Sequence, residues 1–244
     1  MLTEPVATAS EPRPALVPPP GHVLDRSVWE SLTGHHARFA EHRGRAARYH
    51  PDVAPFVALA DPADPRAWAD AAELVGPGGS LSLTGPATWP DGWEVQFQGE
   101  SVQLVDTGLA ARPDPEAVRL GPDDVPQILE LIDRTRPGPF RPRTIELGTY
   151  LGIRRGGVLV AMAGERRHPP GWTEISAVCT DEAFRGHGLA TRLVRAVAAG
   201  IRDRGETPFM HANAANTNAI RLYESLGFTL RSRTLFTSLH WTAA

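Results

Sequence analysis

The stretch Phe184-Arg185-Gly186-His187-Gly188-Leu189-Ala190 carries the strongest indication of the fold. An apolar segment, residues 175–179, comes before it, and an amphipathic segment, residues 188–204, follows with Leu189, Leu193, Val194, Val197 and Ile201 on one helical face. Gly186 and Gly188 let the backbone turn sharply and present several N–H groups, and the helix N-terminus adds a partial positive charge. This order of strand, turn and helix favours a cradle for a pyrophosphate, with the charge of Arg185 beside it.

Two other kinds of nucleotide site fit this stretch poorly. A dinucleotide-binding fold places Gly-x-Gly-x-x-Gly early in a strand-helix-strand unit, whereas here the glycines come late and no third one follows. A triphosphate-binding loop requires Gly-Lys-Ser or Gly-Lys-Thr, and the chain has neither. A nicotinamide-dependent dehydrogenase is therefore disfavoured.

A second motif lies downstream and reads Asn216-Thr217-Asn218-Ala219-Ile220-Arg221-Leu222-Tyr223-Glu224-Ser225-Leu226-Gly227-Phe228. Together with Arg185-x-x-Gly188-x-Ala190 after residues 175–178, it resembles the signatures of the GCN5-related N-acetyltransferase (GNAT) superfamily, and most of all its FR47-like group. The resemblance covers about residues 118–240. It implies an α/β (α+β) fold with a mixed, mostly antiparallel central sheet flanked by helices.

The resemblance implies acetyl-coenzyme A as co-substrate and no metal. Strand residues 177–179 would offer backbone groups to the pantetheine arm as an added strand would, and the turn would hold the pyrophosphate through backbone N–H groups. The binding residues that it implies are Ala177, Val178, Cys179, Arg185, Gly186, His187, Gly188, Leu189, Ala190, Thr191, Asn216 and Tyr223.

The resemblance also indicates the catalytic residues. Tyr223 stands where many relatives have the general acid that protonates the departing thiolate; the alternative is a tyrosine that only packs on the coenzyme. Glu174 on the central strand and His211 on the neighbouring strand are both candidates for the general base, and the sequence does not decide between them. Cys179 is interpreted as a small buried hydrophobe, since direct transfer needs no cysteine nucleophile.

Three parts are expected along the chain: a flexible, proline-rich tail at residues 1–22, an N-terminal α/β domain at 23–112 without a coenzyme motif, and a GNAT domain at 116–244. The N-terminal domain resembles a degenerate GNAT half only by analogy of fold. Periodicity predicts a patchy helical pattern over 25–49 and further helices at 65–75, 122–134, 188–204 and 216–226. Strands are predicted at 80–84, 93–98, 102–105, 118–120, 149–154, 158–165, 172–180, 208–212 and 229–241.

Composition narrows the function further. A net charge of −3 argues against nucleic acid as a partner, and no apolar stretch reaches the roughly 18 residues of a membrane helix, so a cytoplasmic protein is expected. His35, His36, His42 and His50 lack the ligand spacing of a defined metal site. The sequence therefore predicts an acetyl-coenzyme A-dependent N-acetyltransferase that acts on a primary amine of a small molecule, amino acid or peptide, as a monomer or homodimer. The alternative is a non-catalytic acyl-coenzyme A-binding or sensing module.

Overall fold

The predicted strand, turn and helix are present in the computed structural model, which describes residues 21–85 and 88–242. Strand β9 (Trp172–Thr180) leads through the turn into helix α4 (Leu189–Asp203), and the chain returns in strand β10 (Thr207–Asn213). Because α4 crosses between them, β9 and β10 run parallel. Most of the proline-rich tail expected at residues 1–22 lies outside the described residues.

One mixed sheet organises the molecule. Its strand order is β4-β11-β5-β10-β9-β8-β7-β6, and every neighbouring pair except β9 and β10 is antiparallel. The remaining strands are β4 (Ser80–Thr84), β5 (Trp93–Asp106), β6 (Val118–Arg119), β7 (Tyr150–Arg155), β8 (Val158–Glu165) and β11 (Phe228–Trp241). The mostly antiparallel sheet flanked by helices confirms the fold class predicted from the sequence.

Helices cover both faces of this sheet. On one face, α4 and α5 (Thr217–Leu226) pack into the largest apolar core, which contains Leu193, Val197 and Ile201. On the other face, α3 (Val125–Thr135) packs against β7 and β8 around Tyr150 and Met162. The helical periodicity seen in the sequence thus corresponds to the buried faces of α3 and α4.

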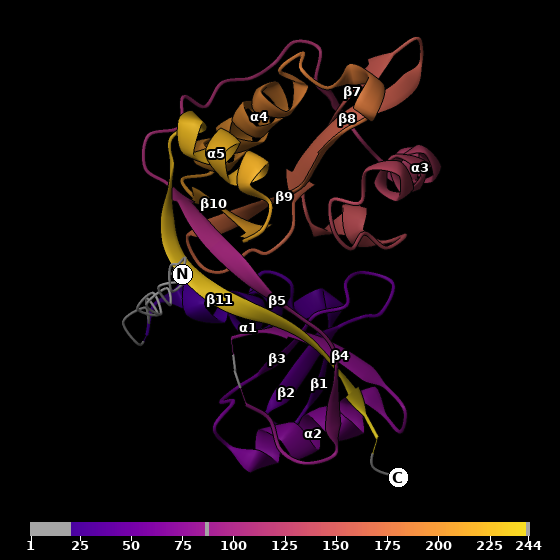
Figure 1. Cartoon of the computed structure of the whole chain (residues 1–244), viewed down its shortest axis with the longest axis vertical. Helices are drawn as coiled ribbons and strands as arrows, with labels where there is room; N and C mark the ends of the chain where they lie inside the picture. Colours follow the sequence, from indigo (N-terminus) through magenta and orange to yellow (C-terminus); the bar gives the residue numbers. More distant parts are fainter. Residues whose placement is uncertain (1–20, 86–87, 243–244) are drawn as a thin grey trace, which may run out of the picture.

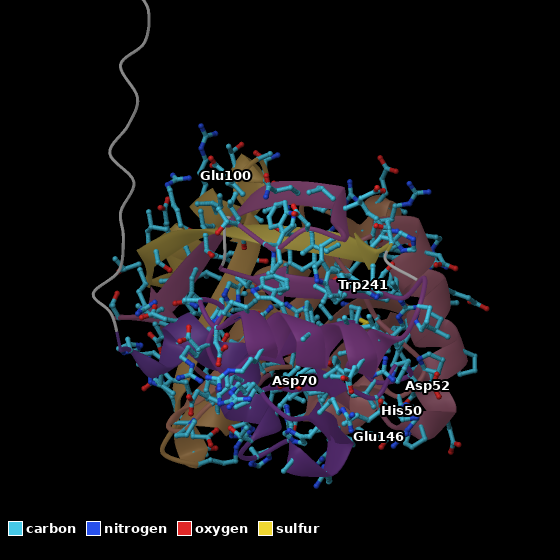
Figure 2. All side chains as sticks on the ribbon, turned by 90° about the horizontal axis from the view of Figure 1, so that it is seen from below. His50, Asp52, Asp70, Glu100, Glu146 and Trp241 are labelled. Atoms are coloured by element: carbon cyan, nitrogen blue, oxygen red, sulfur yellow. The ribbon has the colours of Figure 1, made fainter. Side chains whose placement is uncertain are left out.

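The N-terminal part forms a second, smaller lobe (Figure 1). It holds α1 (Ser27–Leu32), α2 (Pro65–Val75) and a three-stranded antiparallel sheet of β1 (Ala40–Arg43), β2 (Ala46–Tyr49) and β3 (Val57–Leu59). Figure 2 views this lobe from below, with α2 across the front and Asp70 near it. Strands β4 and β5 belong to the large sheet, so strands from both sides of the boundary expected near residue 113 share one sheet.

The helical pattern expected over 25–49 is wrong beyond Leu32, apart from one 3-10 turn at Ala37–Phe39. Residues 40–49 form the β1–β2 hairpin, and Gly44 adopts the positive φ of 49° that its turn requires. Strand β3, which the sequence analysis missed, is buried at every residue and so lacks the alternation of a half-exposed strand.

Within residues 21–85 and 88–242, the helices lack the combination of length and hydrophobicity that a membrane span requires.

We expect Gly227→Ala to destabilise the fold strongly. Gly227 ends α5 with φ of 105°, and an added Cβ would lie 2.5 Å from the backbone carbonyl carbon of Gly108. The matched control is Gly205→Ala, where φ is 79° but no atom lies within 4 Å. Urea unfolding should give a loss of about 1 kcal/mol for Gly205→Ala and roughly 3 kcal/mol or more for Gly227→Ala. Equal losses would show that the contact with Gly108 is unimportant.

Candidate active site

Strands β9 and β10 separate in the middle of the sheet. Their parallel pairing ends at Ile175 and Met210, so that the following residues of the two strands no longer bond to each other. A bulge in β9 accompanies the separation: Ala177 has a φ of +52°, and the register against β8 shifts between Met162 and Gly164. Two strand edges therefore face each other with backbone groups that a ligand can satisfy.

A cleft of about 630 Å³ opens at this separation. Both sequence motifs line it, and so do the loop after α3 and part of the N-terminal lobe. Most of the site residues predicted from the sequence line this cleft: Ala177, Val178, Cys179, Arg185, Gly186, Gly188, Leu189, Ala190, Thr191, His211, Asn216 and Tyr223. Glu174 and His187 do not belong to the cleft lining.

The glycine turn has the backbone geometry of an anion cradle. Gly186 and Gly188 have φ of 80° and 71°, and Gly188 is the left-handed residue directly before α4. The backbone N–H groups in the first turn of α4 therefore have no acceptor within the helix, and they lie at the end of the helix that borders the cleft. The side chain of His187 folds back on the turn, where its Nδ1 lies 2.9 Å from the carbonyl oxygen of Arg185.

Asn216 and Tyr223 reach the cleft from α5. The Asn216 side-chain oxygen caps the helix by accepting from the Ala219 N–H at 3.1 Å, which leaves its amide nitrogen to donate elsewhere. Tyr223 is buried, and this burial, together with nearby Cys179, raises its pKa to about 12. Burial likewise raises the pKa of Cys179 to about 11. Both side chains therefore hold their protons at neutral pH.

A buried charged group stands behind the other end of the cleft. The Glu174 carboxylate accepts two hydrogen bonds of 3.0 Å from Arg166 and one of 2.7 Å from Nδ1 of His211. Although burial alone would raise the pKa of Glu174, the guanidinium groups of Arg166 and Arg167 and the His211 bond hold it well below its usual range. Glu174 is thus a fixed anion with its oxygens already engaged.

His211 connects this group to the cleft. Because its Nδ1 donates to Glu174, its Nε2 carries the lone pair, and Nε2 accepts from the Gln103 side-chain amide at 3.1 Å. Gln103 is oriented by Arg231, which donates to its oxygen at 2.7 Å. Burial, with the charge of Arg167, lowers the pKa of His211 to about 4, while Glu174 opposes this shift. His211 is therefore neutral, with one defined tautomer.

Several residues that line the cleft were not predicted from the sequence. Their common property is that they come from outside the two motifs, and they include Phe56, Thr84, Phe97, Glu100, Arg136, Arg166, Arg167 and Phe236. Glu100 is exposed at the rim of the molecule (Figure 2). The one feature of the sequence that could have indicated them is the pair Arg166 and Arg167, which directly follows an apolar strand. In the structure these two arginines lie opposite Glu174 in the hairpin of β8 and β9 and form backbone hydrogen bonds with it.

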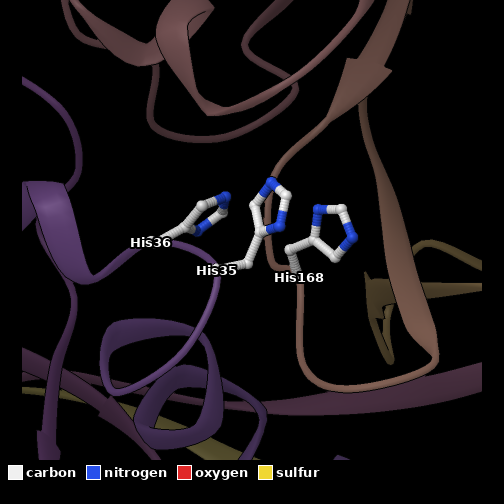
Figure 3. A group of neighbouring side chains, drawn as sticks. All are labelled: His35, His36 and His168. Carbon is white, nitrogen blue, oxygen red and sulfur yellow. The ribbon is translucent and has the colours of Figure 1, made fainter.

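A cluster of three histidines lies apart from the cleft (Figure 3). His35, His36 and His168 approach one another, but both ring nitrogens of His36 are engaged, by Tyr49 and by the carbonyl oxygen of Leu147. The rings of His35 and His168 stack at 3.7 Å, an arrangement that does not direct their in-plane lone pairs to one point. The cluster is explained by stacking and hydrogen bonding within the protein.

Comparison with known proteins gives consistent matches. The FR47-like protein family model matches residues 150–237. A crystal structure of a putative acetyltransferase from the GNAT family of Novosphingobium aromaticivorans is 39% identical, with a TM-score of 0.84, over 91% of this chain and all of that one.

Two curated proteins match over shorter segments. The N-alpha-acetyltransferase RimI of Mycobacterium tuberculosis is 35% identical over 32% of this chain and 51% of its own length. The mycothiol acetyltransferase of Thermobispora bispora is 46% identical over 23% of this chain and 19% of its own length. The chain thus matches about half of the first relative and about a fifth of the second.

We expect the free energy of unfolding to fall as the pH is lowered from about 6.5 to 4. Burial lowers the pKa of His36 to about 3 and of His211 to about 4, so the unfolded chain binds more protons than the folded chain in this range. Each of these two histidines then lowers the free energy of unfolding by up to about 1.4 kcal/mol for each pH unit. Urea unfolding between pH 7 and 4 measures this slope.

The variants His36→Gln and His42→Gln separate this effect from general acid sensitivity. His36→Gln should flatten the slope, whereas His42→Gln, at an exposed position, should leave it as in the parent chain. The same slope in all three proteins would contradict the assignment of His36 as a histidine held neutral by burial.

Proposed function

The chain belongs to the GCN5-related N-acetyltransferase family, and from its cleft we propose that it transfers the acetyl group of acetyl-coenzyme A to a primary amine of a small molecule, amino acid or peptide. The observation that carries the proposal is the separation of β9 from β10 directly beside the glycine turn. An extended arm that ends in a pyrophosphate fits this combination, because strand edges and helix N-termini satisfy these two kinds of group.

The proposed coenzyme site uses mostly backbone. Residues 177–179 bond the amides of the pantetheine arm, and the N–H groups of 186–191 hold the pyrophosphate with the charge of Arg185 beside it. The backbone N–H of Arg185 itself donates to the carbonyl oxygen of Glu182. Asn216 donates its side-chain amide to the arm. Acetyl-coenzyme A supplies the activated thioester, and the chain positions it against the far end of the cleft.

Tyr223 is the proposed general acid. The amine nitrogen attacks the thioester carbonyl carbon, the C–N bond forms and the C–S bond breaks, so the leaving sulfur must receive a proton. Tyr223 lines the cleft, and with a pKa raised to about 12 it retains its phenolic proton for this step.

His211 is the proposed general base, with Glu174 as a positioning residue. His211 lines the cleft and carries its lone pair on Nε2, whereas Glu174 does not belong to the lining and is bonded on both oxygens. The amine would give its proton to Nε2 in exchange for the bond from Gln103. Glu174 would then stabilise the imidazolium through Nδ1.

Thiol release tests the proposal as a whole. The purified chain is titrated with acetyl-coenzyme A by calorimetry, and coenzyme A thiol is then followed with a panel of amino acids, amines and short peptides. We expect binding and amine-dependent thiol release. Binding without release for any amine would favour the non-catalytic binding module, and absence of binding would contradict the coenzyme site itself.

The variant Tyr223→Phe tests the acid. Removing the hydroxyl should lower kcat about 100-fold, because general acid assistance contributes at least that much. The dissociation constant for acetyl-coenzyme A should change by no more than about threefold, which corresponds to less than 1 kcal/mol of binding free energy. An unchanged kcat would remove Tyr223 from the mechanism.

The variant His211→Asn tests the base. Asparagine keeps a hydrogen-bonding side chain but cannot take the proton, so kcat should fall about 100-fold and the acid limb of the pH profile should flatten. A reduced rate with an unaltered pH profile would assign His211 a structural role instead.

A further inference from the structure

Arg167 is a buried guanidinium with incomplete pairing. Its side chain is 3% exposed and belongs to the cleft lining. Its closest protein contacts are all long: 3.3 Å to Ser27 Oγ, 3.5 Å to Thr84 Oγ1, and 3.4 and 3.5 Å to the ring nitrogens of His211. Among the described residues, its Nε is buried without any hydrogen-bond partner.

The neighbouring carboxylate offsets this charge only in part, because it is shared with Arg166. Glu174 lies 3.6 Å from Nε of Arg167, but it forms its two 3.0 Å bonds with Arg166. With one negative charge on Glu174, one positive charge on each arginine and a neutral His211, the group carries a net charge of about +1. A buried cation whose ion pair and hydrogen bonds are all long is costly unless something completes its pairing.

We propose that the acceptor amine carries a carboxylate that binds Arg167 in the cleft beside His211, so that the substrate class is small amino acids. The inference rests on the proposed function, since it names the acceptor of that reaction. A carboxylate is the planar anion that a guanidinium pairs with most directly. It would give Arg167 the short hydrogen bonds that it lacks within the protein.

The distances favour an acid group close to the amine. Nη1 of Arg167 lies 3.4 Å from Nε2 of His211, the proposed base. A carboxylate bound to Arg167 therefore places an amine one carbon away within reach of that lone pair. An α-amino acid has this spacing, whereas an amine separated from its acid by a long chain does not.

Binding of the carboxylate would also tune the base. Arg167 is one of the causes that lower the pKa of His211, second to burial itself. An anion paired with Arg167 offsets this charge, so the pKa of His211 rises toward the neutral range where a base acts best. Acceptor binding and activation of the base are then coupled.

Aromatic side chains complete the acceptor end of the cleft. The Arg167 guanidinium lies over the Phe56 ring, with its central carbon 4.8 Å from the ring centre. Phe97 and Phe236 also line the cleft, and their ring centres are 6.2 Å apart. These walls suit an apolar side chain on the amino acid.

Matched acceptor pairs test the inference in the full-length chain. Initial rates of thiol release with acetyl-coenzyme A are compared for alanine, leucine and phenylalanine against their amides and against ethylamine, isopentylamine and phenethylamine. We expect kcat/KM to favour the amino acids about 100-fold or more, because a site built for a polar group rejects analogues that lack it. Arg167→Gln should reduce this ratio at least tenfold, since it removes a charge-assisted hydrogen bond.

Two further variants keep the test decisive. Arg167→Lys retains the charge and should preserve part of the ratio. The control Arg154→Gln removes an arginine paired with Asp124 outside the cleft and should leave the ratio unchanged. If Arg167→Gln fails to fold in a thermal melt, the parent ratio and Arg167→Lys decide the question.

Turnover of the amines or amides as efficiently as the amino acids would overturn the inference and leave the proposed acetyl transfer standing. An absence of turnover with every amino acid would also overturn it. Calorimetric titration of the same samples with acetyl-coenzyme A separates this result from failure of the coenzyme site, which would show as loss of binding.

Discussion

The separation of β9 from β10 is the constraint on which the site depends. Up to Ile175 and Met210 the two strands satisfy each other's backbone groups, and beyond this pair they do not. The positive φ of Ala177 and the bulge beside it turn β9 away, while β10 stays bonded to β5 through Val102 and Ser101. A gap of this kind, inside an otherwise continuous sheet, leaves polar backbone groups that need a partner. The glycine turn and α4 lie at one end of the gap, and Glu174 and His211 lie at the other.

The two lobes contribute different parts of this arrangement. The C-terminal motifs supply the gap, the turn and Tyr223, whereas the N-terminal part supplies β5, which supports β10, and the aromatic side chain of Phe56. Strands β5 and β11 run from one lobe to the other (Figure 1). The lining of the cleft is therefore assembled from residues far apart in sequence, and the smaller lobe contributes to it as well as the motifs.

The sequence was sufficient for the fold class and family, because local patterns determine them: helical periodicity, the glycine turn and the Asn216–Phe228 motif are all contiguous. The binding residues that the resemblance implied also line the cleft, with the exception of His187. The sequence did not predict the features that depend on contacts between distant residues. The β1–β2 hairpin was hidden in an irregular apolar pattern, and nothing in the sequence placed Arg167 next to His211, 44 positions away. The sequence did not decide between Glu174 and His211. The proposal for His211 rests on its place in the cleft lining, to which Glu174 does not belong, because both side chains are hydrogen-bonded within the protein.

Hydrogen–deuterium exchange with and without acetyl-coenzyme A tests whether the coenzyme binds between β9 and β10, since it reports where the coenzyme orders the backbone. We expect slower exchange at residues 176–180, 186–191 and 211–213, and unchanged exchange in β1, β2 and β3. Protection confined to the smaller lobe, or no protection at 176–180 when acetyl-coenzyme A is bound, would contradict the placement of the coenzyme between β9 and β10.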